Sequence, residues 1–360
     1  MDLSNLRIIS AGAGSGKTFR LTSEMVALLQ SGAVRPEGII ATTFTRKAAA
    51  ELQERVRVRL LAEGLTQEAE ALTNALIGTV HGLGVKLLQR FAYEAGVSPE
   101  VSIIADEDQQ ILFNQSLTTV LTEDKVREMD TLCRRLGLDK NDYFDWRSQL
   151  RTLTEVARAN DFQADVLEKS KHESVRTFLE FLDPISDRSA DAWNRELAGQ
   201  MERAIAGIQA GEDGTKATQT ALSTLRQRKR ELDLHGELPW SDWARLSKLK
   251  TGARSREVVE ELKEYATDHD RHPAFRTDIT AFIHLLFELA SASMAEYDAY
   301  KKQRGLIDYT DMEVLVNHLL DHPPVQEVLR EELDLLMVDE FQDTSPIQLA
   351  IFLKLSRYAR

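Results

Sequence analysis

Two short segments of the chain carry the residue types that bind and cleave a nucleotide. The first is a glycine-rich turn between an apolar run and an amphipathic stretch. Glycines in such a turn let backbone N–H groups converge on phosphate oxygens, and the N-terminus of the following helix favours negative charge. We therefore predict a phosphate-binding loop at Ala11, Gly12, Ala13, Gly14, Ser15, Gly16, Lys17 and Thr18.

Two side chains of this loop have separate predicted roles. Lys17 is placed to pair with the β- and γ-phosphates, and the Thr18 hydroxyl is placed to bind Mg²⁺. The usual pattern begins with glycine, whereas this loop begins with Ala11. A glycine-rich turn that binds nothing is therefore the alternative interpretation of the loop taken alone.

The second segment is an apolar run, Leu335 to Val338, followed by Asp339 and Glu340. A carboxylate at the end of such a strand suits Mg²⁺, and we assign that role to Asp339. Glu340 suits a general base that accepts a proton from the attacking water. Adjacent acidic residues are also common on protein surfaces. The pair therefore indicates an ATPase site only in combination with the phosphate loop. Together the two segments predict ATP and Mg²⁺ as ligands.

The elements that must position these residues alternate between strand and helix in the first hundred residues. Short apolar runs predict buried strands, and each is followed by an amphipathic stretch that predicts a helix. Such alternation implies a parallel sheet covered by helices on both faces. The predicted strands are 6–10, 38–43, 77–80 and 101–104, and the predicted helices are 17–29, 46–62 and 83–95, with Gly64 and Gly96 as stops for the last two.

From Asp106 to about Tyr300 nearly every segment reads as polar amphipathic helix, and strand character returns only at Leu335. A helix is predicted after that strand, from Pro346 to Arg357. The fold class is thus α/β, a doubly wound parallel sheet of the phosphate-loop type interrupted by a large all-helical insertion domain. The predicted ranges are 1–104 and 301–360 for the two parts of the ATPase domain and 105–300 for the insertion.

Composition limits the class of protein further. The chain has 360 residues, a formal net charge of −13 and a single cysteine, Cys133, so it has no internal disulfide. It shows no signal-peptide pattern and no run of 18 apolar residues, which predicts a cytoplasmic protein without a membrane partner. The acidic balance argues against nonspecific binding of nucleic acid through overall charge. Locally, Arg226 to Arg256 holds nine Lys or Arg against four Asp or Glu, either a DNA-facing surface or a solvated helix face.

The sequence around the carboxylates, Val338-Asp-Glu-Phe-Gln-Asp-Thr-Ser345, resembles the Walker B motif of superfamily 1 DNA helicases of the UvrD/Rep and RecB/AddA group. Further motifs of that group occur in the family order. They are the loop ending at Thr18, Ala41-Thr-Thr-Phe-Thr-Arg-Lys-Ala-Ala-Ala-Glu-Leu52, Gly78-Thr-Val-His-Gly82 and Ile307-Asp-Tyr-Thr-Asp-Met312. The helical middle of the chain carries no motif that resembles the family.

The resemblance implies a RecA-like ATPase domain of an ATP-dependent helicase or translocase that acts in DNA repair or recombination with 3′ to 5′ movement. Its partners would be single-stranded and duplex DNA. A second protein subunit of a helicase–nuclease complex would be a further partner. The resemblance implies that Phe44 contacts a base, that Thr45, Thr79 and His81 lie near the DNA backbone, and that Gln342 lies near the nucleotide. Without the motif context, a core aromatic is the more common interpretation of a residue such as Phe44, and a satisfied polar histidine that of His81. The alternative functions are a phosphate-loop ATPase that does not translocate and a nucleotide-dependent DNA-binding module.

Two departures from the family pattern qualify these expectations. No Gln precedes the phosphate loop, so the family's adenine-reading element has no counterpart among the ten residues before Ala11. The sequence also stops at Arg360, shortly after the Walker B segment, which leads us to expect a part of a longer motor. We expect residues 1–360 alone to bind Mg-ATP weakly and to hydrolyse it barely above background.

Overall fold

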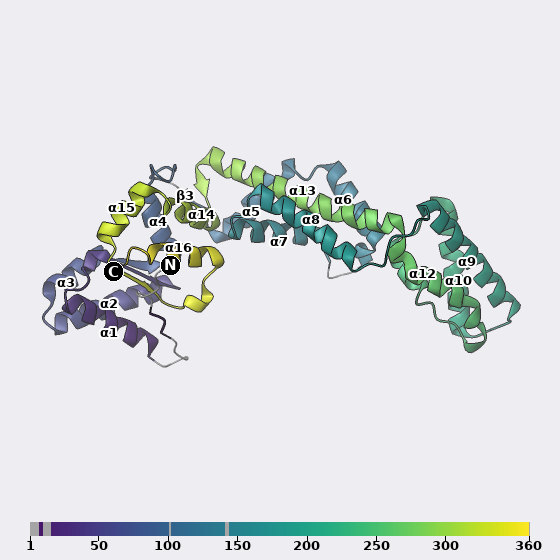
Figure 1. The fold of residues 1–360 in the computed structure, drawn as a ribbon, viewed down its shortest axis with the longest axis horizontal. Helices are drawn as coiled ribbons and strands as arrows, with labels where there is room; N and C mark the ends of the chain where they lie inside the picture. The colour runs from purple at the N-terminus through teal and green to yellow at the C-terminus, as the bar shows by residue number, and fades with distance from the viewer. Residues whose placement is uncertain (1–6, 10–15, 101, 141–143, 360) are drawn as a thin grey trace. The chain divides into compact units, whose positions relative to one another are not determined.

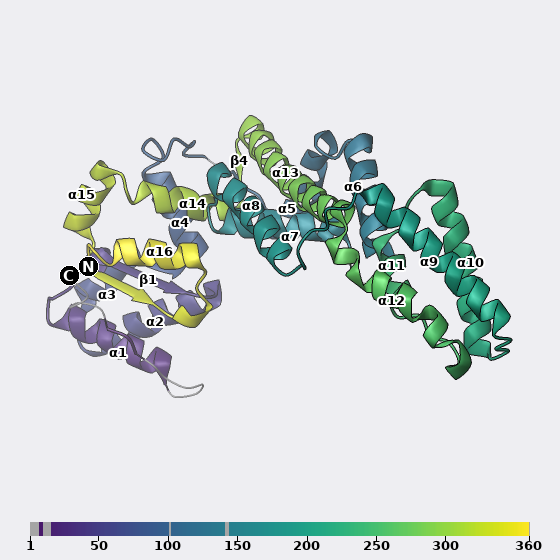
Figure 2. The ribbon, with the colours of Figure 1, turned by 45° about the vertical axis from the view of Figure 1, so that its right-hand side comes forward.

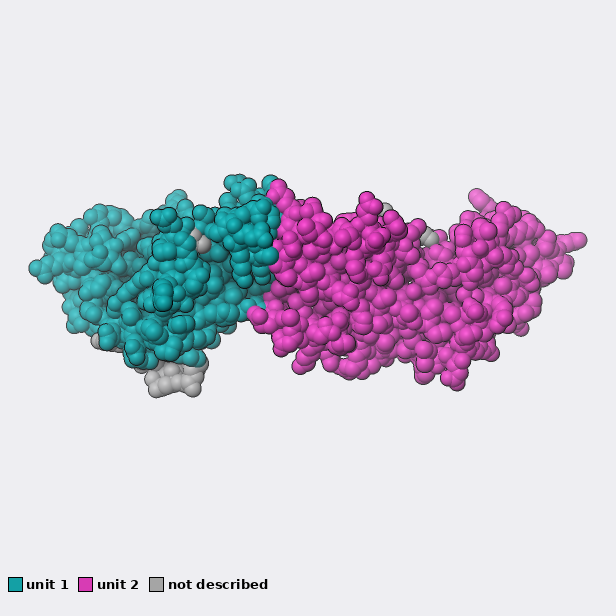
Figure 3. All heavy atoms as spheres, turned by 90° about the horizontal axis from the view of Figure 1, so that it is seen from above, with its two compact units in different colours: residues 1–113, 158–161, 298–360 teal, residues 114–157, 162–297 magenta. Residues whose placement is uncertain are grey.

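A computed structural model describes residues 7–9, 16–100, 102–140 and 144–359. The chain divides into two compact units, coloured separately in Figure 3. Unit 1 comprises Met1–Phe113, Arg158–Asp161 and Asp298–Arg360, and unit 2 comprises Asn114–Ala157 and Phe162–Tyr297. The residue boundaries 104/105 and 300/301 drawn from the sequence remain a prediction.

Unit 1 is built on a small parallel sheet with the strand order β2-β1-β5. The central strand β1 (Ile39–Thr43) pairs with β2 (Leu76–Thr79) on one side and with β5 (Leu335–Val338) on the other, in both cases parallel. All five residues of β1 are buried, as expected of a central strand with covered faces. The predicted parallel sheet is therefore present, and it joins strands from both ends of the chain.

Successive residues of each strand enter cores on opposite faces of the sheet. Ile40 and Leu336 face one core, whereas Ile39, Ala41 and Leu335 face the other. This alternation follows from the two-residue period of a strand and explains why the strands read as continuous apolar runs. Both faces of the sheet are thus closed by helices.

The helices of unit 1 form one layer on each face of this sheet (Figures 1 and 2). One layer contains α1 (Lys17–Gln30), α2 (Arg46–Ala62) and α3 (Thr66–Ala71). The other contains α4 (Val80–Arg90), α14 (Tyr309–Leu319), α15 (Pro323–Glu332) and α16 (Pro346–Leu355). The first turns of α5 (Asp106–Ser116) also belong to unit 1, with the short strand pair β3 (Ser102–Ile103) and β4 (Leu306–Ile307).

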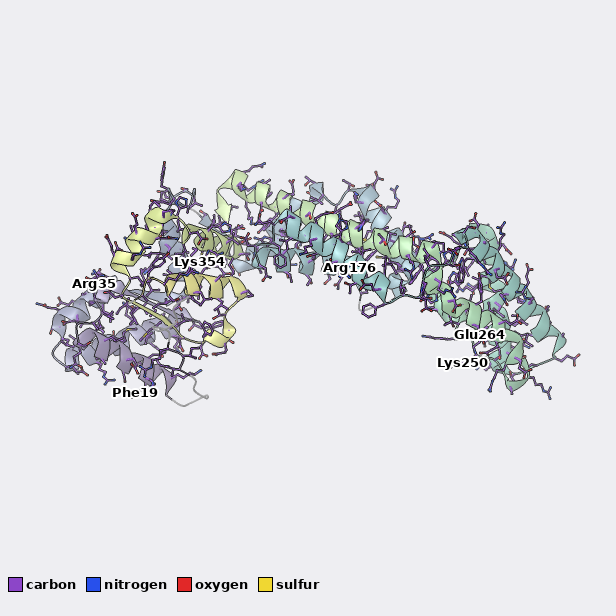
Figure 4. All side chains as sticks on the ribbon, in the orientation of Figure 1. Phe19, Arg35, Arg176, Lys250, Glu264 and Lys354 are labelled. Carbon is purple, nitrogen blue, oxygen red and sulfur yellow. The ribbon has the colours of Figure 1, made fainter. Side chains whose placement is uncertain are left out.

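An ion pair attaches the start of β1 to the start of β5. The Arg35 guanidinium, labelled in Figure 4, lies 2.8 Å from a carboxylate oxygen of Asp334, which is 2% exposed. A Cβ on Gly38 would come within 2.6 Å of the same carboxylate, so only glycine fits there. The hydrogen bonds and ionic attraction of Asp334 raise the pKa of Arg35. This ion pair holds together two segments that are 299 residues apart in sequence.

Two local predictions were wrong, and one short strand was not predicted. Residues 7–9, the described part of the run predicted as a strand at 6–10, form no strand; Ile8 is 81% exposed, and Arg7 pairs with Glu24 of α1 instead of with a sheet neighbour. The helix predicted at 83–95 is α4, which begins at Val80 because the Thr79 hydroxyl accepts a hydrogen bond from the Gly82 N–H, and ends at Arg90. Strand β4 was not predicted at all, because two residues are too short to show a pattern.

The described residues of unit 2 form helices joined by loops, with no strand among them, and the unit is inserted between segments of unit 1. One hydrophobic core lies between α6, α7 and α13, around Met129, Trp146 and Leu289. A second lies among α9 to α12, around Trp193, Leu225 and Trp243. The helices are α6 (Glu123–Leu136), α7 (Trp146–Ala159), α8 (Ala164–Glu180), α9 (Ala190–Ala210), α10 (Lys216–His235), α11 (Trp240–Leu246), α12 (Glu260–Thr267) and most of α13 (Pro273–Arg304).

Helix α13 is, among the described residues, the one helix long and apolar enough to cross a membrane by length and composition. A core helix of a soluble protein passes the same test. Leu285, Leu289 and Ala290 of α13 are buried against α6 and α7, and the helix also buries the polar side chains of Asp278 and Ser293. These contacts describe a helix that packs into the core of unit 2.

Candidate active site

The two chemical segments of the sequence meet at the carboxyl edge of the sheet in unit 1. Lys17 is the first residue of α1, and Glu340 follows β5 by two residues. The Lys17 Nζ lies 3.4 Å from Oε1 and 3.3 Å from Oε2 of Glu340. Both side chains are about one-third exposed, so the pair lies at the surface of the sheet edge where a ligand can reach it.

The start of α1 has the features of an anion-binding helix end. Gly16 precedes the helix with φ +82°, a left-handed conformation that glycine adopts without strain, and as a glycine it offers no side chain to cap the helix. The first backbone N–H groups of a helix have no intrahelical acceptor and attract phosphate oxygens. Gly16, Lys17 and Thr18 therefore fit a phosphate chain. The predicted loop residues Ala11 to Ser15 lie outside the described residues.

Glu340 occupies an unusual backbone position. Its φ of +54° places a non-glycine residue in the left-handed region, which carries a conformational cost and is often found at functional sites. The Gln342 side chain donates a hydrogen bond to Oε2 of Glu340. This hydrogen bond and the neighbouring Lys17 ammonium lower the pKa of Glu340, so the carboxylate is ionised at neutral pH. An ionised carboxylate is the form that a general base requires.

Asp339 and Thr18 flank this pair. The Asp339 N–H donates to the Thr42 carbonyl at 2.9 Å, extending the ladder of β5 by one residue, and its Oδ1 accepts from the Glu340 N–H at 3.0 Å. Thr18 lies next to Lys17 in the first turn of α1. Their hydroxyl and carboxylate oxygens are the hard donors that Mg²⁺ prefers, and Mg²⁺ is usually held by one or two such groups together with phosphates. The donor set therefore fits the predicted ion.

The predicted DNA-contacting residues follow the two neighbouring strands at the same edge. Because Thr43 of β1 lies opposite Thr79 of β2, the segments that continue from them emerge side by side. Phe44 is 70% exposed, which is incompatible with a core aromatic. The Thr45 hydroxyl caps α2 by accepting from the Ala48 N–H at 3.0 Å.

His81 has defined surroundings within the first turn of α4. Its ring stacks on Tyr309 with centroids 4.2 Å apart and planes inclined by 16°. Its Nε2 lies 3.3 Å from Oε1 of Glu313, and its side chain remains 42% exposed. No pattern in the sequence indicates Glu313, because its approach to His81 depends on the packing of α14 against α4.

A buried ionic cluster supports the same region of unit 1. Asp308 caps α14 and forms a reciprocal capping box with Asp311. Arg158 and Lys301 lie against both carboxylates, with Arg158 2.5 Å from Asp308 and Lys301 2.5 Å from Asp311. The positive charge of Arg158 and Lys301 lowers the pKa of Asp308 against the effect of its burial. The spacing Asp-x-x-Asp before an apolar run could have indicated the capping box from sequence, but not its cationic partners.

A parallel sheet covered on both faces, with a lysine at the start of its first helix facing a carboxylate at the end of a distant strand, defines a phosphate-loop ATPase fold of the RecA-like type. Within that class the family is shown by comparison with known proteins. The model of the UvrD/REP helicase N-terminal domain matches residues 3–359, and the chain belongs to this family.

Its relatives include longer proteins. The A subunit of the ATP-dependent helicase/nuclease of Natranaerobius thermophilus is 24% identical over 97% of this chain and 31% of that protein. The protein of the same name from Levilactobacillus brevis is 26% identical over 96% of this chain and 32% of its own length. The chain thus spans about a third of the curated relatives it matches.

Proposed function

We propose that this chain provides the ATP-binding front part of a motor that moves along single-stranded DNA, in the 3′ to 5′ direction, during repair or recombination. The observation that carries the proposal is the meeting of Lys17 and Glu340 at 3.3 Å across a sequence separation of 323 residues. Family membership supports ATP-dependent helicase chemistry rather than another use of the fold.

In the proposed mechanism each site residue has one task. Lys17 neutralises negative charge on the β- and γ-phosphates of ATP. Glu340, ionised beside Lys17 and Gln342, orients the attacking water and accepts its proton. Thr18 and Asp339 would hold Mg²⁺, which when bound supplies positive charge to the phosphate oxygens. Gln342 holds the carboxylate of Glu340 in place by its hydrogen bond.

The DNA strand in this proposal crosses the edge where β1 and β2 end. The exposed ring of Phe44 suits stacking with a base, a contact that any base accepts and that a motor moving over all sequences requires. Thr45, Thr79 and His81 surround the strand as polar groups. The relatives are named as A subunits of a helicase/nuclease, and we accordingly propose that this chain works with a partner subunit on duplex DNA with single-stranded ends, in the cytoplasm.

Two substitutions, made in the full-length protein, test the nucleotide site. Lys17→Ala should weaken ATP binding, because it removes the cation that faces the phosphates. Glu340→Gln should leave ATP binding intact and reduce turnover by roughly 10²-fold or more, because the amide keeps the shape of the side chain but accepts no proton. Nucleotide affinity by fluorescence titration and phosphate release with single-stranded DNA present measure the two effects.

The control is Lys354→Ala, since that lysine bonds the Asn317 carbonyl and Asp321, away from Lys17 and Glu340. ATP affinity that survives Lys17→Ala, or turnover that survives Glu340→Gln, would contradict the assignment. ATP turnover that single-stranded DNA does not stimulate would favour an ATPase that does not translocate.

A further inference from the structure

Glu313 is a buried carboxylate of α14 that lies between the Walker B segment and the DNA-facing segment. The residue is 8% exposed. Its Oε1 accepts a hydrogen bond from the Gln348 side chain at 2.6 Å and lies 3.3 Å from Nε2 of His81. Burying a carboxylate is costly unless hydrogen-bond donors compensate it, and the Gln348 amide is such a donor. One buried atom therefore joins two segments that the proposed function places at different ligands.

On the DNA side, this contact fixes the orientation of an otherwise half-exposed ring. The stacking on Tyr309 holds one face of the His81 imidazole, and the contact with Glu313 holds one edge. The Glu313 carboxylate lies 3.3 Å from Nε2, so it restrains that edge of the ring by close contact. Moving Glu313 would therefore free the ring to turn.

On the nucleotide side, Gln348 is part of the cap of α16. Its side-chain oxygen accepts from the Ser345 N–H, and the Ser345 hydroxyl accepts from the Gln348 N–H, both at 3.3 Å. Ser345 lies five residues after Glu340, with the short turn Phe341–Asp343 between them. A displacement of the Walker B segment on nucleotide binding or hydrolysis would move this cap, and with it the partner of Glu313.

We propose that Glu313 is a positioning residue that transmits the state of the ATP site to His81, and thereby couples DNA binding to ATP turnover. The inference rests on the proposed function, because it takes His81 to face DNA and Glu340 to serve hydrolysis. Coupling between two sites needs a physical connection whose arrangement both ligands bias. The path Glu340, Ser345, Gln348, Glu313, His81 is such a connection, made of one short turn and three polar contacts.

Substitution of Glu313 in the full-length protein should change the stimulation of ATP turnover by DNA without changing the hydrolysis step itself. Glu313→Ala should leave ATP affinity and DNA-independent turnover unchanged within about twofold, while stimulation by single-stranded DNA falls about tenfold, within the usual range of coupling between sites. Glu313→Gln should retain most of the stimulation, because its amide oxygen still accepts the hydrogen bond from Gln348 and the side chain keeps its size beside His81. The matched control is Glu327→Ala, which removes an exposed glutamate from the neighbouring helix α15.

Full stimulation in Glu313→Ala would overturn the proposal. An equal loss of turnover with and without DNA would also overturn it, because that result describes a general structural defect.

Proton NMR tests, in the absence of DNA, whether Glu313 positions His81. The imidazole proton signals of His81, assigned by their loss in His81→Gln, should be shifted by the Tyr309 ring current and should move when Mg-ADP is added. In Glu313→Ala the response to Mg-ADP should disappear. A response that persists would refute the connection. A protein that keeps this response but shows no DNA-stimulated turnover would instead refute the proposed function.

Discussion

At the residue scale, Lys17 and Glu340 show which parts of a candidate active site can be predicted from a sequence. Each was predicted because a local pattern carries it, a glycine-rich turn in one case and an apolar strand ending in carboxylates in the other. The positive φ of Glu340 and its hydrogen bond from Gln342 arise from the turn at Phe341–Asp343 and have no sequence pattern of their own. The contacts of Glu313 are tertiary and were equally inaccessible.

Phe44 provides a test of the DNA-facing edge. Phe44→Ala in the protein should weaken binding of single-stranded DNA by about 1–3 kcal/mol, the scale of one stacked base. Its ring is 70% exposed, so the thermal stability of the protein should change little. Fluorescence anisotropy with a labelled oligonucleotide and a thermal melt measure the two quantities.

Phe181→Ala is the matched control, since that ring is 85% exposed and belongs to unit 2. It should leave affinity for single-stranded DNA unchanged. Undiminished affinity in Phe44→Ala, or a loss that Phe181→Ala reproduces, would remove Phe44 from the DNA-binding surface.

At the element scale, the sequence predicted the elements that have both a clear period and clear end signals. Helix α2 has the predicted bounds, and Gly64 adopts φ +80° just after it, as a helix-terminating glycine should. The strand predicted at 6–10 is not formed by its described residues, 7–9. An apolar run forms a strand only where a neighbouring strand pairs with it. The packing partners of the insertion helices could not be predicted. An amphipathic pattern shows that a helix buries one face, but not which helix covers that face.

The basic segment Arg226–Arg256 contains some cations that form ion pairs within the unit and others that do not. Lys229 of α10 is held in ion pairs with Glu202 and Asp233. By contrast, Lys248 and Lys250, the latter labelled in Figure 4, form no ion pair with any residue that the structure describes. They line a groove of about 550 Å³ in unit 2. Its lining also includes Lys216, Thr220, Thr224 and Arg245.

We predict that this groove contacts DNA phosphates. Replacing Lys216, Lys248 and Lys250 by Ala should reduce the slope of log affinity against log salt concentration by about 1 for each lysine that binds a phosphate. Lys229→Ala, which removes an internally paired charge from the same segment, should leave the slope unchanged. Titrations with a forked duplex at several salt concentrations measure it, and an unaltered slope in the triple variant would identify the segment as a solvated face.

The second core of unit 2 contains a histidine that is held neutral. His272 is 1% exposed and lies among the rings of Trp193, Trp240 and Trp243, with centroid separations of 5.6, 4.9 and 5.5 Å. Its Nδ1 accepts a hydrogen bond from the Ala274 N–H at 3.1 Å. Burial, followed by the positive charge of Arg135, lowers its pKa to about 4.

This lowered pKa predicts an acid-sensitive core. The unfolded chain takes up a proton at this histidine below its ordinary pKa of 6.5, whereas the folded chain does so only near 4. The preference of the folded state for the neutral ring therefore adds to the free energy of unfolding above pH 6.5. This contribution, up to about 3 kcal/mol, is lost as the pH falls from 6.5 to 4. Urea unfolding followed by tryptophan fluorescence across this range measures it.

The variants for this experiment are His272→Phe and, as control, the exposed His235→Gln. In His272→Phe the dependence of unfolding free energy on pH between 4 and 6.5 should flatten, even if the absolute stability differs. In the control it should match the parent. An undiminished slope in His272→Phe would assign the acid sensitivity to other groups.

At the scale of the whole molecule, the candidate nucleotide-site residues and the tryptophans belong to different units. Unit 1 contains the described residues of the candidate nucleotide site, and its two cores lie on the faces of the sheet. All four tryptophans, Trp146, Trp193, Trp240 and Trp243, belong to unit 2 and are buried in its two cores. Each unit thus has its own hydrophobic cores, and tryptophan fluorescence reports on unit 2.

These separate cores predict that nucleotide stabilises one unit without the other. A ligand that binds only the folded state raises stability by about 2.7 kcal/mol at a hundred times its dissociation constant. Saturating Mg-ADP should therefore increase the hydrogen-exchange protection of the β1 amides by up to about 100-fold in the protein. The urea midpoint seen by tryptophan fluorescence should not move, because that signal arises in unit 2. Lys17→Ala should abolish the effect on β1, whereas a common shift of both signals would show that the two units unfold as a single cooperative structure.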